Sequence, residues 1–412
     1  MCIFAPANQK TMKKILNISL KVFCTIILSA LSLLAVFSIS PIYNFNDTAA
    51  FSGPDIFNPY AGVDSNQVWK RANFHTHTKI KGPLNECPYW PETVYEDYKK
   101  LGYDILTFSN HNRLTEHPCD TSLQVNVYEH GYGLEKYHKL VFGSDKVNHF
   151  DHLLPVLASQ RQWQMDYLGK DADFIQLNHP YRTPGSTEKI MEKLTGYRII
   201  ELDSGIGTGQ EYWDWALSTG HYSFALANDD NHNSKASSRT AVRANFLDAE
   251  SGKYEDLKET LLSGAYYSMR IPDYGNGDWS IKYAENADLP EIDEIGLRQD
   301  TLFVTLSEPA DSIVVTGQGH TTLASDKFTD RIEYVIKEND PYARVTAYFN
   351  DEAVIYTNAF ARYDSSISRT PYIEAEHTVN IPLTVLFNLF LAIVAAACIY
   401  AEIKLLSRKK KD

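Results

Sequence analysis

The sequence predicts a mixed α/β protein: a parallel α/β barrel, then a small antiparallel β-sandwich, with a membrane-spanning helix near each end. Three observations predict this class. Strand-like and helix-like segments alternate over the first two thirds of the 412 residues, short alternating strands without long helices follow, and an uncharged apolar run lies near each terminus. Alternation of strands and helices is typical of parallel sheets, and seven strands over this length favour a barrel over an open sheet.

The N-terminal apolar run extends from Val22 to Ile39 and follows three lysines, Lys10, Lys13 and Lys14. Its length is close to that of a membrane span. A secretory signal peptide usually has a shorter apolar core and a small-residue cleavage site, which is not evident after this run. We therefore expect an uncleaved anchor, and a cleaved signal peptide is the alternative.

The C-terminal apolar run extends from Ile381 to Ala401, and Arg408 and the lysines 409–411 follow it. Lys and Arg gather on the cytoplasmic side of membrane segments. Both basic clusters lie outside the two apolar runs, so we expect both termini in the cytoplasm. The residues from about Pro41 to Asn380 should then lie on the extracytoplasmic side of the membrane, periplasmic or outer.

Composition divides the chain into five expected regions. They are a cytoplasmic stub with the first transmembrane helix (1–40), a linker rich in Asn, Pro, Gly and Ser (41–70), the barrel (71–275), the sandwich (276–370), and a tether with the second transmembrane helix and a basic cytoplasmic tail (371–412).

The secondary structure of the body is predicted from hydrophobic periodicity. The barrel strands are expected at Ala72–His77, Ile105–Ser109, Val125–Glu129, Lys139–Phe142, Phe174–Asn178, Ile199–Asp203 and Phe224–Asn228. The helices between them are expected at Pro91–Leu101, Phe150–Leu168, Glu188–Leu194 and Tyr212–Ser218. The sandwich strands are expected at Asp300–Ser307, Asp311–Thr316, Arg331–Ile336, Ala343–Phe349 and Ala353–Asn358.

A His-x-His motif, His75 and His77, lies at the end of the first predicted strand. Side chains alternate faces along a strand, so the two imidazoles point the same way and can bind one metal ion. Residues able to bind metal recur at the ends of the other predicted strands: His111, Glu129, His138, His179, Glu201, Asp203, Asp230 and His232. Loops at the carboxyl ends of barrel strands build the active site. We therefore expect these side chains to converge at one mouth of the barrel, although His138 precedes its strand. Imidazole with carboxylate suits Zn, Mn or Fe better than Ca or Mg.

The other histidines are expected to be surface groups or satisfied core groups: His117, His149, His152, His221, His320 and His377. We also expect His130 to be structural, because Glu129 beside it takes the inward position. Asp229 alternates with Asp230 and should face away from the site.

The motifs and their order resemble the polymerase and histidinol phosphatase (PHP) superfamily over roughly Trp69 to Phe246. The matching segments are Phe74–Thr78, Gly102–Leu106 running into Ser109–Asn112, Glu129, His138, His179–Pro180 and Asp230–His232.

The resemblance implies a distorted (β/α)7 barrel that holds two or three divalent metal ions and hydrolyses a phosphate mono- or diester with a metal-bound hydroxide. It assigns His75, His77, Glu129 and Asp230 to one metal. Glu129 would bridge to a second metal held also by His138 and His179, and His111 and His232 would hold a third.

The chain departs from the family in two places. The turn after His-x-His usually carries an acid or His, but here it reads Lys79-Ile80-Lys81-Gly82, and the Asp of the usual Thr-Asp-His is Asn110. The first departure removes a ligand of the third metal. We therefore expect either a dinuclear site or a site in which Lys81 supplies a positive charge, and a solvated Lys81 is the alternative.

Four further side chains are candidates for supporting roles. Arg182 follows His179 by three residues and could bind a phosphate oxygen, so Asp230, Arg182 and Lys81 are the expected catalytic residues. Glu201 could orient a ligand histidine. Cys87 and Cys119 each follow one of the first two strands, so a disulfide between them is feasible in an exported domain; free thiols are the alternative.

The formal charge of −13 argues against nucleic acid as a general partner. The expected substrate is a phosphorylated small molecule, a lipid headgroup or an envelope polymer. Two other functions stay open: a non-catalytic binding or scaffold protein on the same barrel, and a metallohydrolase of a non-phosphate bond, because fold does not determine function.

Overall fold

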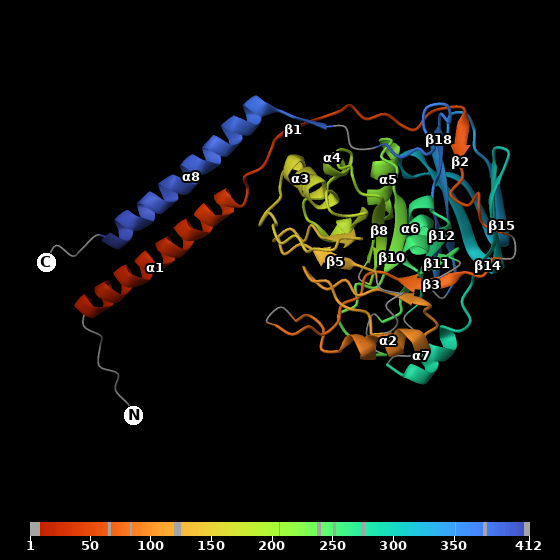
Figure 1. Cartoon of the computed structure of the whole chain (residues 1–412), viewed down its shortest axis with the longest axis horizontal. Coiled ribbons are helices and arrows are strands. Elements are labelled where there is room, and N and C mark those ends of the chain that lie inside the picture. Colours follow the sequence, from red (N-terminus) through yellow and green to blue (C-terminus); the bar gives the residue numbers. More distant parts are fainter. Residues whose placement is uncertain are drawn as a thin grey trace.

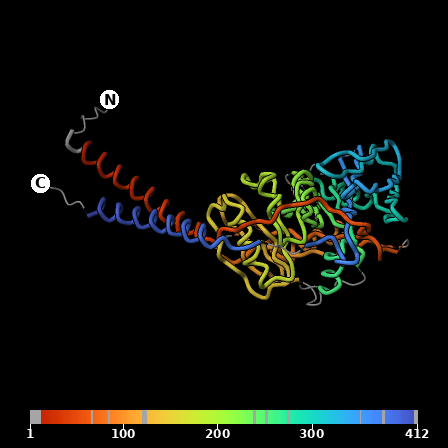
Figure 2. Tube along the Cα trace, turned by 90° about the horizontal axis from the view of Figure 1, so that it is seen from above, coloured from red at the N-terminus to blue at the C-terminus, as the bar shows by residue number. Residues whose placement is uncertain are grey.

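Two long helices project side by side from an α/β body in the computed structural model (Figure 1). The structure describes residues 9–64, 67–82, 85–118, 125–205, 207–236, 240–249, 253–272, 277–350, 352–373 and 377–407. The helices are α1 (Gln9–Val36) and α8 (Ile381–Ser407). They run antiparallel, and the start of α1 and the end of α8 lie at the same far end of the pair (Figures 1 and 2).

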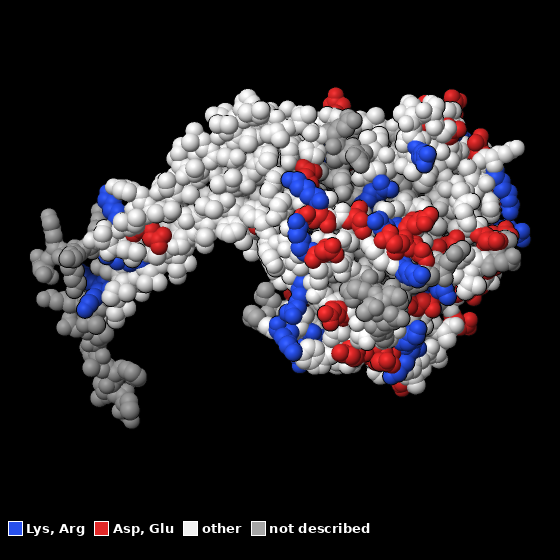
Figure 3. Space-filling view, in the orientation of Figure 1, with Lys and Arg blue, Asp and Glu red and all other residues white. Residues whose placement is uncertain are grey.

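The helix pair has the length and composition of two membrane spans, Met12–Val36 and Ile381–Ser407. Its surface is almost free of charge in the face shown in Figure 3, and charged side chains gather at its far end and over the body. Small and apolar side chains pack between the helices, among them Ala35, Leu391 and Ala395. Both expected apolar helices are therefore present. Helix α8 begins at the predicted Ile381, and α1 ends within a turn of the predicted Ile39 but begins well before the predicted Val22.

The two linkers that leave the helices pair with each other before they reach the body. Strands β1 (Tyr43–Phe45) and β19 (His377–Val379) form an antiparallel ribbon. The ribbon holds the two linkers together, so both helices leave the body from one place.

The first sheet of the body contains five strands in the order β10-β8-β7-β6-β5, and β9 pairs with β8. Their bounds are β5 Val127–His130, β6 Lys139–Phe142, β7 Phe174–Leu177, β8 Ile199–Ser204, β9 Gly207–Thr208 and β10 Phe224–Asn228. The ladders β10–β8 and β8–β7 are parallel, whereas β7–β6 and β6–β5 are antiparallel.

The second sheet has the order β13-β14-β16-β17-β12-β11-β3-β4, with β15 on β14, and β18 linking β16 to β2. Its bounds are β2 Asp55–Phe57, β3 Lys70–Asn73, β4 Ile105–Leu106, β11 Arg243–Leu247, β12 Tyr266–Arg270, β13 Ile292–Arg298, β14 Thr301–Gly317, β15 Thr321–Val335, β16 Tyr342–Tyr348, β17 Val354–Thr357 and β18 Phe360–Tyr363.

Helices cover these sheets and connect their strands. They are α2 (Pro91–Lys100), α3 (Ala158–Gly169), α4 (Glu188–Met191), α5 (Gln210–Ser218), α6 (Tyr254–Ser263) and α7 (Trp279–Glu285), with 3₁₀ turns η2 (Pro180–Arg182) and η3 (Gln318–His320). The predicted helix at Phe150–Leu168 begins only at Ala158, because Pro155 lacks an N–H and disfavours helical backbone in the residue before it.

The predicted parallel barrel is the main correction to the fold. All seven predicted strands exist, but they are divided between the two sheets and form no closed barrel within the described residues. β5 and β6 are joined without a helical crossover and pair antiparallel, and β7 also pairs antiparallel with β6, whereas β3 and β4 are joined through α2 and pair in parallel. The fold is nevertheless mixed α/β, as predicted.

The predicted sandwich strands are present, and the first three of them are longer than expected. The first two merge into β14, and β15 begins at Thr321 instead of Arg331. These strands continue the second sheet, because β17 pairs with β12 through Tyr356 opposite Ser268. The boundary at residue 276 stays a prediction, and the strands on its two sides belong to one hydrogen-bonded sheet.

Candidate metal centre

The His-x-His motif lies just beyond the end of β3, because that strand ends at Asn73. The chain stays extended there: Thr76 forms an isolated parallel bridge with Asn231, and the His77 N–H donates to the Asn231 carbonyl at 2.8 Å. The alternation of side chains is therefore preserved past the strand. The rings of His75 and His77 lie 5.4 Å apart between centroids, and both are fully buried.

Glu129, near the end of β5, is the centre of the cluster. Its Oε2 lies 3.1 Å from the Nε2 atoms of three imidazoles, His75, His77 and His111. Its other oxygen, Oε1, lies 3.0 Å from His138 Nδ1 and 3.4 Å from His179 Nε2. One buried carboxylate thus faces five imidazoles, three on one oxygen and two on the other.

Asp230 adds a second carboxylate next to the first. Its Oδ1 lies 3.3 Å from His75 Nε2, 3.4 Å from His77 Nε2 and 3.5 Å from His232 Nδ1. Asp230 has φ of 49° and His179 has φ of 25°. Backbone in this left-handed region is unfavourable for residues other than glycine and is often found at functional sites.

Glu201 on β8 supports the cluster from behind. Its Oε1 lies 2.8 Å from His75 Nδ1, and its Oε2 accepts the backbone N–H of His179 at 3.0 Å. This hydrogen bond favours the tautomer of His75 that carries its proton on Nδ1, so that Nε2 faces Glu129 and Asp230. The geometry matches the supporting role expected of Glu201 from the sequence.

The donor set fits divalent metal ions. Several buried nitrogen and oxygen atoms of the cluster have no hydrogen-bond partner: His75 Nε2, His77 Nδ1 and Nε2, His111 Nδ1, Glu129 Oε2 and His179 Nδ1. Leaving such atoms unpaired costs free energy, and ligand atoms about 3 Å apart match the separation around an ion with bonds of roughly 2 Å. Four groups have ligand atoms close enough to share an ion: His75–His77–Glu129–Asp230, His75–His179–Glu201, His77–Glu86–His232 and His111–Glu129–His138.

The electrostatics of the cluster keep its carboxylates ionised. Burial opposes the charge on Glu129, but the neighbouring imidazoles, His111 first, hold its pKa well below the ordinary value. Burial lowers the pKa of His111 to about 4, so that imidazole is neutral and has a lone pair to offer a metal. Burial opposes a charge on His75 and His77, but the neighbouring carboxylates of Glu129 and Asp230 raise the pKa of both, to about 9 for His77, so a bound metal ion would displace protons from these two imidazoles.

Glu86 is a candidate metal ligand that sequence reasoning missed. Its Oε2 lies 3.4 Å from His111 Nε2, 3.7 Å from His232 Nε2 and 3.9 Å from His77 Nδ1. It therefore supplies the acid that the turn after His-x-His lacked. The available signal was simple, because Glu86 is the first acidic residue after His77.

Lys81, expected at that position, lies elsewhere. Its side chain is exposed and borders a surface hollow that also involves Trp90 and Arg113, and its carbonyl accepts a hydrogen bond from Arg113. The acidic position of the turn is shifted along the loop, so a positive charge from Lys81 is not needed to replace a ligand. The catalytic role of Lys81 stays a prediction without support from its position.

Arg182, in the 3₁₀ turn after His179, does reach the centre. Its guanidinium forms an ion pair with Asp230 Oδ2, and its side chain is 24% exposed. The cation thus stands between the cluster and solvent. This is the position from which it could exchange Asp230 for an anionic substrate group.

Two polar side chains beside the cluster, those of Asp229 and Asn110, hold the surrounding loops through hydrogen bonds to backbone N–H groups. Asp229 accepts the N–H groups of Ala241, Val242 and Arg243, so it faces away as predicted. The Asn110 side-chain oxygen accepts the Thr78 N–H at 2.8 Å and so fixes the end of the His-x-His segment.

Asp203 and Cys87 were also singled out from the sequence. Asp203 is paired with Arg243 at 2.6 Å and with Arg270 at 2.8 Å, and it takes no part in the cluster. Cys87 is a free thiol, and its predicted disulfide partner, Cys119, lies outside the described residues.

The histidines that were expected to be structural have other partners. His130 Nε2 lies 2.8 Å from the Phe150 carbonyl oxygen, His377 Nε2 lies 2.7 Å from Asp166 Oδ2, and His320 is paired with Asp214.

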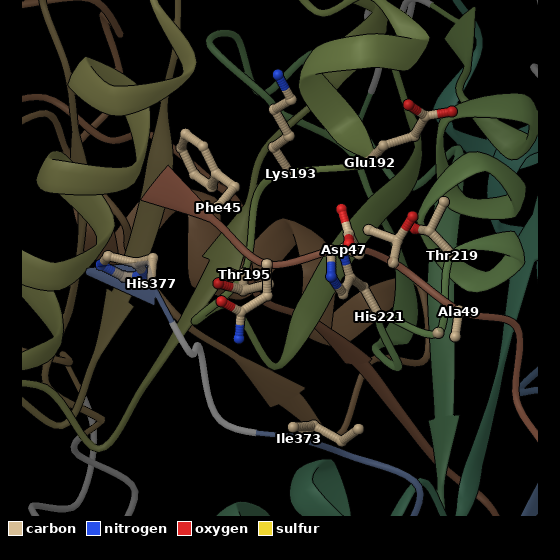
Figure 4. A pocket seen from close by; sticks show the side chains of 13 residues that line it. Phe45, Asp47, Ala49, Glu192, Lys193, Thr195, Thr219, His221, Ile373 and His377 are labelled. Atoms are coloured by element: carbon tan, nitrogen blue, oxygen red, sulfur yellow. The ribbon is translucent and has the colours of Figure 1, made fainter. Parts of the chain in front are cut away.

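A cavity of about 220 Å³ lies elsewhere, where the β1 and β19 linkers meet the end of α5 (Figure 4). Asp47, Lys193, His221 and His377 contribute polar groups to its wall. None of the cluster residues lines it, so it is separate from the candidate metal centre.

Comparison with known proteins adds little at this distance. Neither a family model nor a curated protein matches the chain. Among solved structures, it is similar to a two-domain protein containing a predicted PHP-like metal-dependent phosphoesterase from Bacteroides vulgatus. The identity is 15%, the TM-score is 0.38, and the alignment covers 77% of this chain and 99% of the other. The function is therefore inferred below from the residues of the site.

Proposed function

We propose that this chain is a membrane-anchored, extracytoplasmic, metal-dependent hydrolase that cleaves a phosphate mono- or diester. One observation carries the proposal: a cluster of six histidines and three carboxylates, with Glu129 and Asp230 buried and Glu86 at its exposed rim, whose ligand atoms converge while several buried ones lack any hydrogen-bond partner. The order of the motifs that form this cluster resembles the PHP superfamily, whose members generally hydrolyse phosphate esters.

Different residues of the chain would have different roles in such a site. Glu129 presents one oxygen to each half of the cluster, and Glu201 holds His75 in the tautomer that faces it. Divalent ions bound here would lower the pKa of a coordinated water and offset charge on the phosphoryl group. Arg182 would bind a phosphate oxygen when its guanidinium turns from Asp230.

The number of ions follows from Glu86. Without an acid in the turn after His-x-His, two ions would be expected. Glu86 restores a third group together with His77 and His232, and His111 is within 3.4 Å of it. We therefore propose three sites, and metal analysis that finds only two ions per chain after saturation would contradict the third.

The placement across the membrane rests on charge and on the antiparallel helices. Lysines precede the first span, and Arg408 with three lysines follows the second. The start of α1 and the end of α8 lie at the same end of the helix pair (Figure 1), so one leaflet would face both basic clusters. The positive-inside tendency then places the body on the extracytoplasmic side.

The test is hydrolysis of a panel of phosphomonoesters and diesters by the full-length protein in detergent, with added Mn or Zn. Activity should require the metal and should be lost in His75→Ala and Asp230→Ala. His149→Ala, which changes an exposed histidine, is the matched control and should keep activity.

Two results would redirect the proposal. Metal-dependent cleavage of an amide or another non-phosphate bond, with no phosphate ester cleaved, would make the protein a different metallohydrolase. Tight metal binding without any hydrolysis would favour a binding or scaffold protein.

A further inference from the structure

We propose that the phosphate ester this protein hydrolyses is carried by a membrane lipid, and that the metal centre receives it from the bilayer surface. The inference rests on the proposed function and adds the substrate class. It is carried by a continuous path of contacts from the end of the first membrane helix to the rim of the metal centre.

The path begins where the first span ends. The span reaches Val36, and the next residue, Phe37, docks on the body. The Phe37 carbonyl lies 2.6 Å from His152 Nδ1, and its ring stacks on Phe150 with centroids 6.1 Å apart. The Ser38 carbonyl accepts a hydrogen bond from Gln160 at 2.9 Å. The segment 150–160 therefore lies at the level where the helix leaves the bilayer.

That segment is hydrogen-bonded to the loop that follows β5. Asp151 Oδ2 accepts the backbone N–H groups of Tyr132 and Gly133, each at 2.7 Å, and the Leu134 N–H donates to the Leu153 carbonyl at 2.8 Å. The loop 131–134 thus lies at the same level. The views agree, because the orange-yellow loops of this region lie on the side of the body nearest the helices (Figures 1 and 2).

The same loop borders the metal centre. It begins two residues after Glu129, and the ring of Tyr132 lies 5.2 Å from that of the candidate ligand His111. The Tyr132 hydroxyl donates to the His111 carbonyl at 3.3 Å. One aromatic side chain therefore separates a candidate ligand from the surface that carries the membrane helix.

This surface presents apolar side chains to the outside. Leu134 is 75% exposed, Val156 is 53% exposed and Tyr132 is 42% exposed, although each belongs to an otherwise ordered loop. Exposed apolar side chains are ordinary when single, but these three lie on loops held together by the contacts above. Side chains of this kind are stabilised by contact with the acyl and headgroup boundary, where Tyr is also favoured.

These features favour a lipid-borne ester over a soluble one. A soluble phosphate ester would not need its site beside the anchor or an apolar rim toward the bilayer. A lipid with a phosphate in its headgroup can keep its acyl chains in the membrane while the headgroup reaches the centre past Tyr132. The anchor would then place the enzyme at the depth of its substrate.

The experiment compares lipid and soluble esters with the full-length protein reconstituted in phosphatidylcholine vesicles. Dioleoyl phosphatidic acid and phosphatidylglycerol are the lipid probes, and glycerol 3-phosphate and glycerophosphoglycerol are their soluble counterparts. The test variant is Leu134→Asp/Val156→Asp. The control, Val68→Asp/Ile281→Asp, makes the same charge change at two exposed apolar residues of the body that lie outside these loops.

The lipid probe of one pair should be hydrolysed faster than its soluble counterpart. The test variant should lower only the lipid rate, by about tenfold or more, because burying one Leu or Val contributes roughly 1.5–3 kcal/mol and 1.4 kcal/mol is a factor of ten. The control variant should leave both rates unchanged. A nitroxide on Leu134→Cys should also be more accessible to lipid-soluble oxygen than one on Val68→Cys.

Three outcomes would overturn the inference: faster hydrolysis of the soluble ester, equal loss of both rates in the test variant, or a nitroxide at 134 that is exposed only to water. The first two leave the phosphoesterase proposal standing, because an ester is still cleaved. Failure to cleave any of the four probes or any member of the wider panel would remove both proposals together.

Discussion

Replacing Glu201 by Gln tests whether this carboxylate orients His75 or binds a metal itself. The carboxylate accepts from His75 Nδ1 at 2.8 Å and from the His179 backbone N–H at 3.0 Å, and Asn228 Nδ2 lies 3.3 Å from it. It is completely buried. A Gln side chain has nearly the same shape but only one acceptor oxygen.

The magnitude follows from these contacts. The Gln oxygen can keep the bond from His75, but its NH₂ group then faces the N–H of His179, so one buried donor loses its acceptor. An unsatisfied buried group costs about 1–3 kcal/mol. Loss of a carboxylate that orients a ligand imidazole typically lowers metal affinity by about 10–100-fold. We expect a loss in this range with no change in the number of ions at saturation.

The assay is a competition titration against a chelator of known affinity, with metal content measured on the saturated protein. Thermal unfolding of the metal-free variant serves as the folding control. Unchanged affinity would refute the orienting role of Glu201. A loss of one ion per chain at saturation would instead make Glu201 a ligand, which its grouping with His75 and His179 permits.

Three further predictions follow from other parts of the structure. Glu86→Gln should weaken the binding of one metal ion selectively, so metal titration should show one site lost while the ions around Glu129 stay bound. Equal weakening of the binding of all ions would contradict a separate third site. Arg344→Met should lower the free energy of unfolding by about 3–5 kcal/mol, because it removes the buried guanidinium that lies 2.5 Å from the buried Asp214 carboxylate and leaves only the half-exposed His320 to pair with it. Denaturant unfolding that matches the parent would contradict this. Burial lowers the pKa of His221 from 6.5 to about 4, so the unfolded chain binds a proton between these values that the folded chain does not, and stability should fall by at most about 3 kcal/mol as pH drops through that window. His221→Gln should flatten this part of the melting-temperature profile, and a profile identical to the parent would exclude His221 as its source.

Much of the site could be predicted from sequence because its residues follow short buried strands. β6 and β10 have their predicted bounds, and His138 and Asp230 stand next to those bounds. The motif order then determined which side chains belong together. Glu86 was missed because it lies in a loop with no periodicity, where the position of an acid depends on the path of the chain and not on residue spacing.

The distorted barrel expected from the sequence is not confirmed, and no closed barrel is found among the described residues, for a related reason. Strand–helix alternation predicts parallel neighbours, but it does not reveal which strands pair in hairpins. β5, β6 and β7 form antiparallel neighbours, and β3 pairs with β11, a strand outside the predicted set. Pairing partners depend on long-range packing, and the local pattern of a strand does not contain them.

The ligands nevertheless converge, because two single bridges join the sheets at the metal centre. Thr76 pairs with Asn231 and His111 pairs with Glu129, each in parallel register. These bridges link the strand ends of β3 with β10 and of β4 with β5, so ligands from both sheets meet where regular pairing has already ended. A site at such a junction does not need a closed barrel. It needs only strand ends that a few backbone contacts hold together. Metal ions bound by side chains from both sheets would hold these strand ends together further.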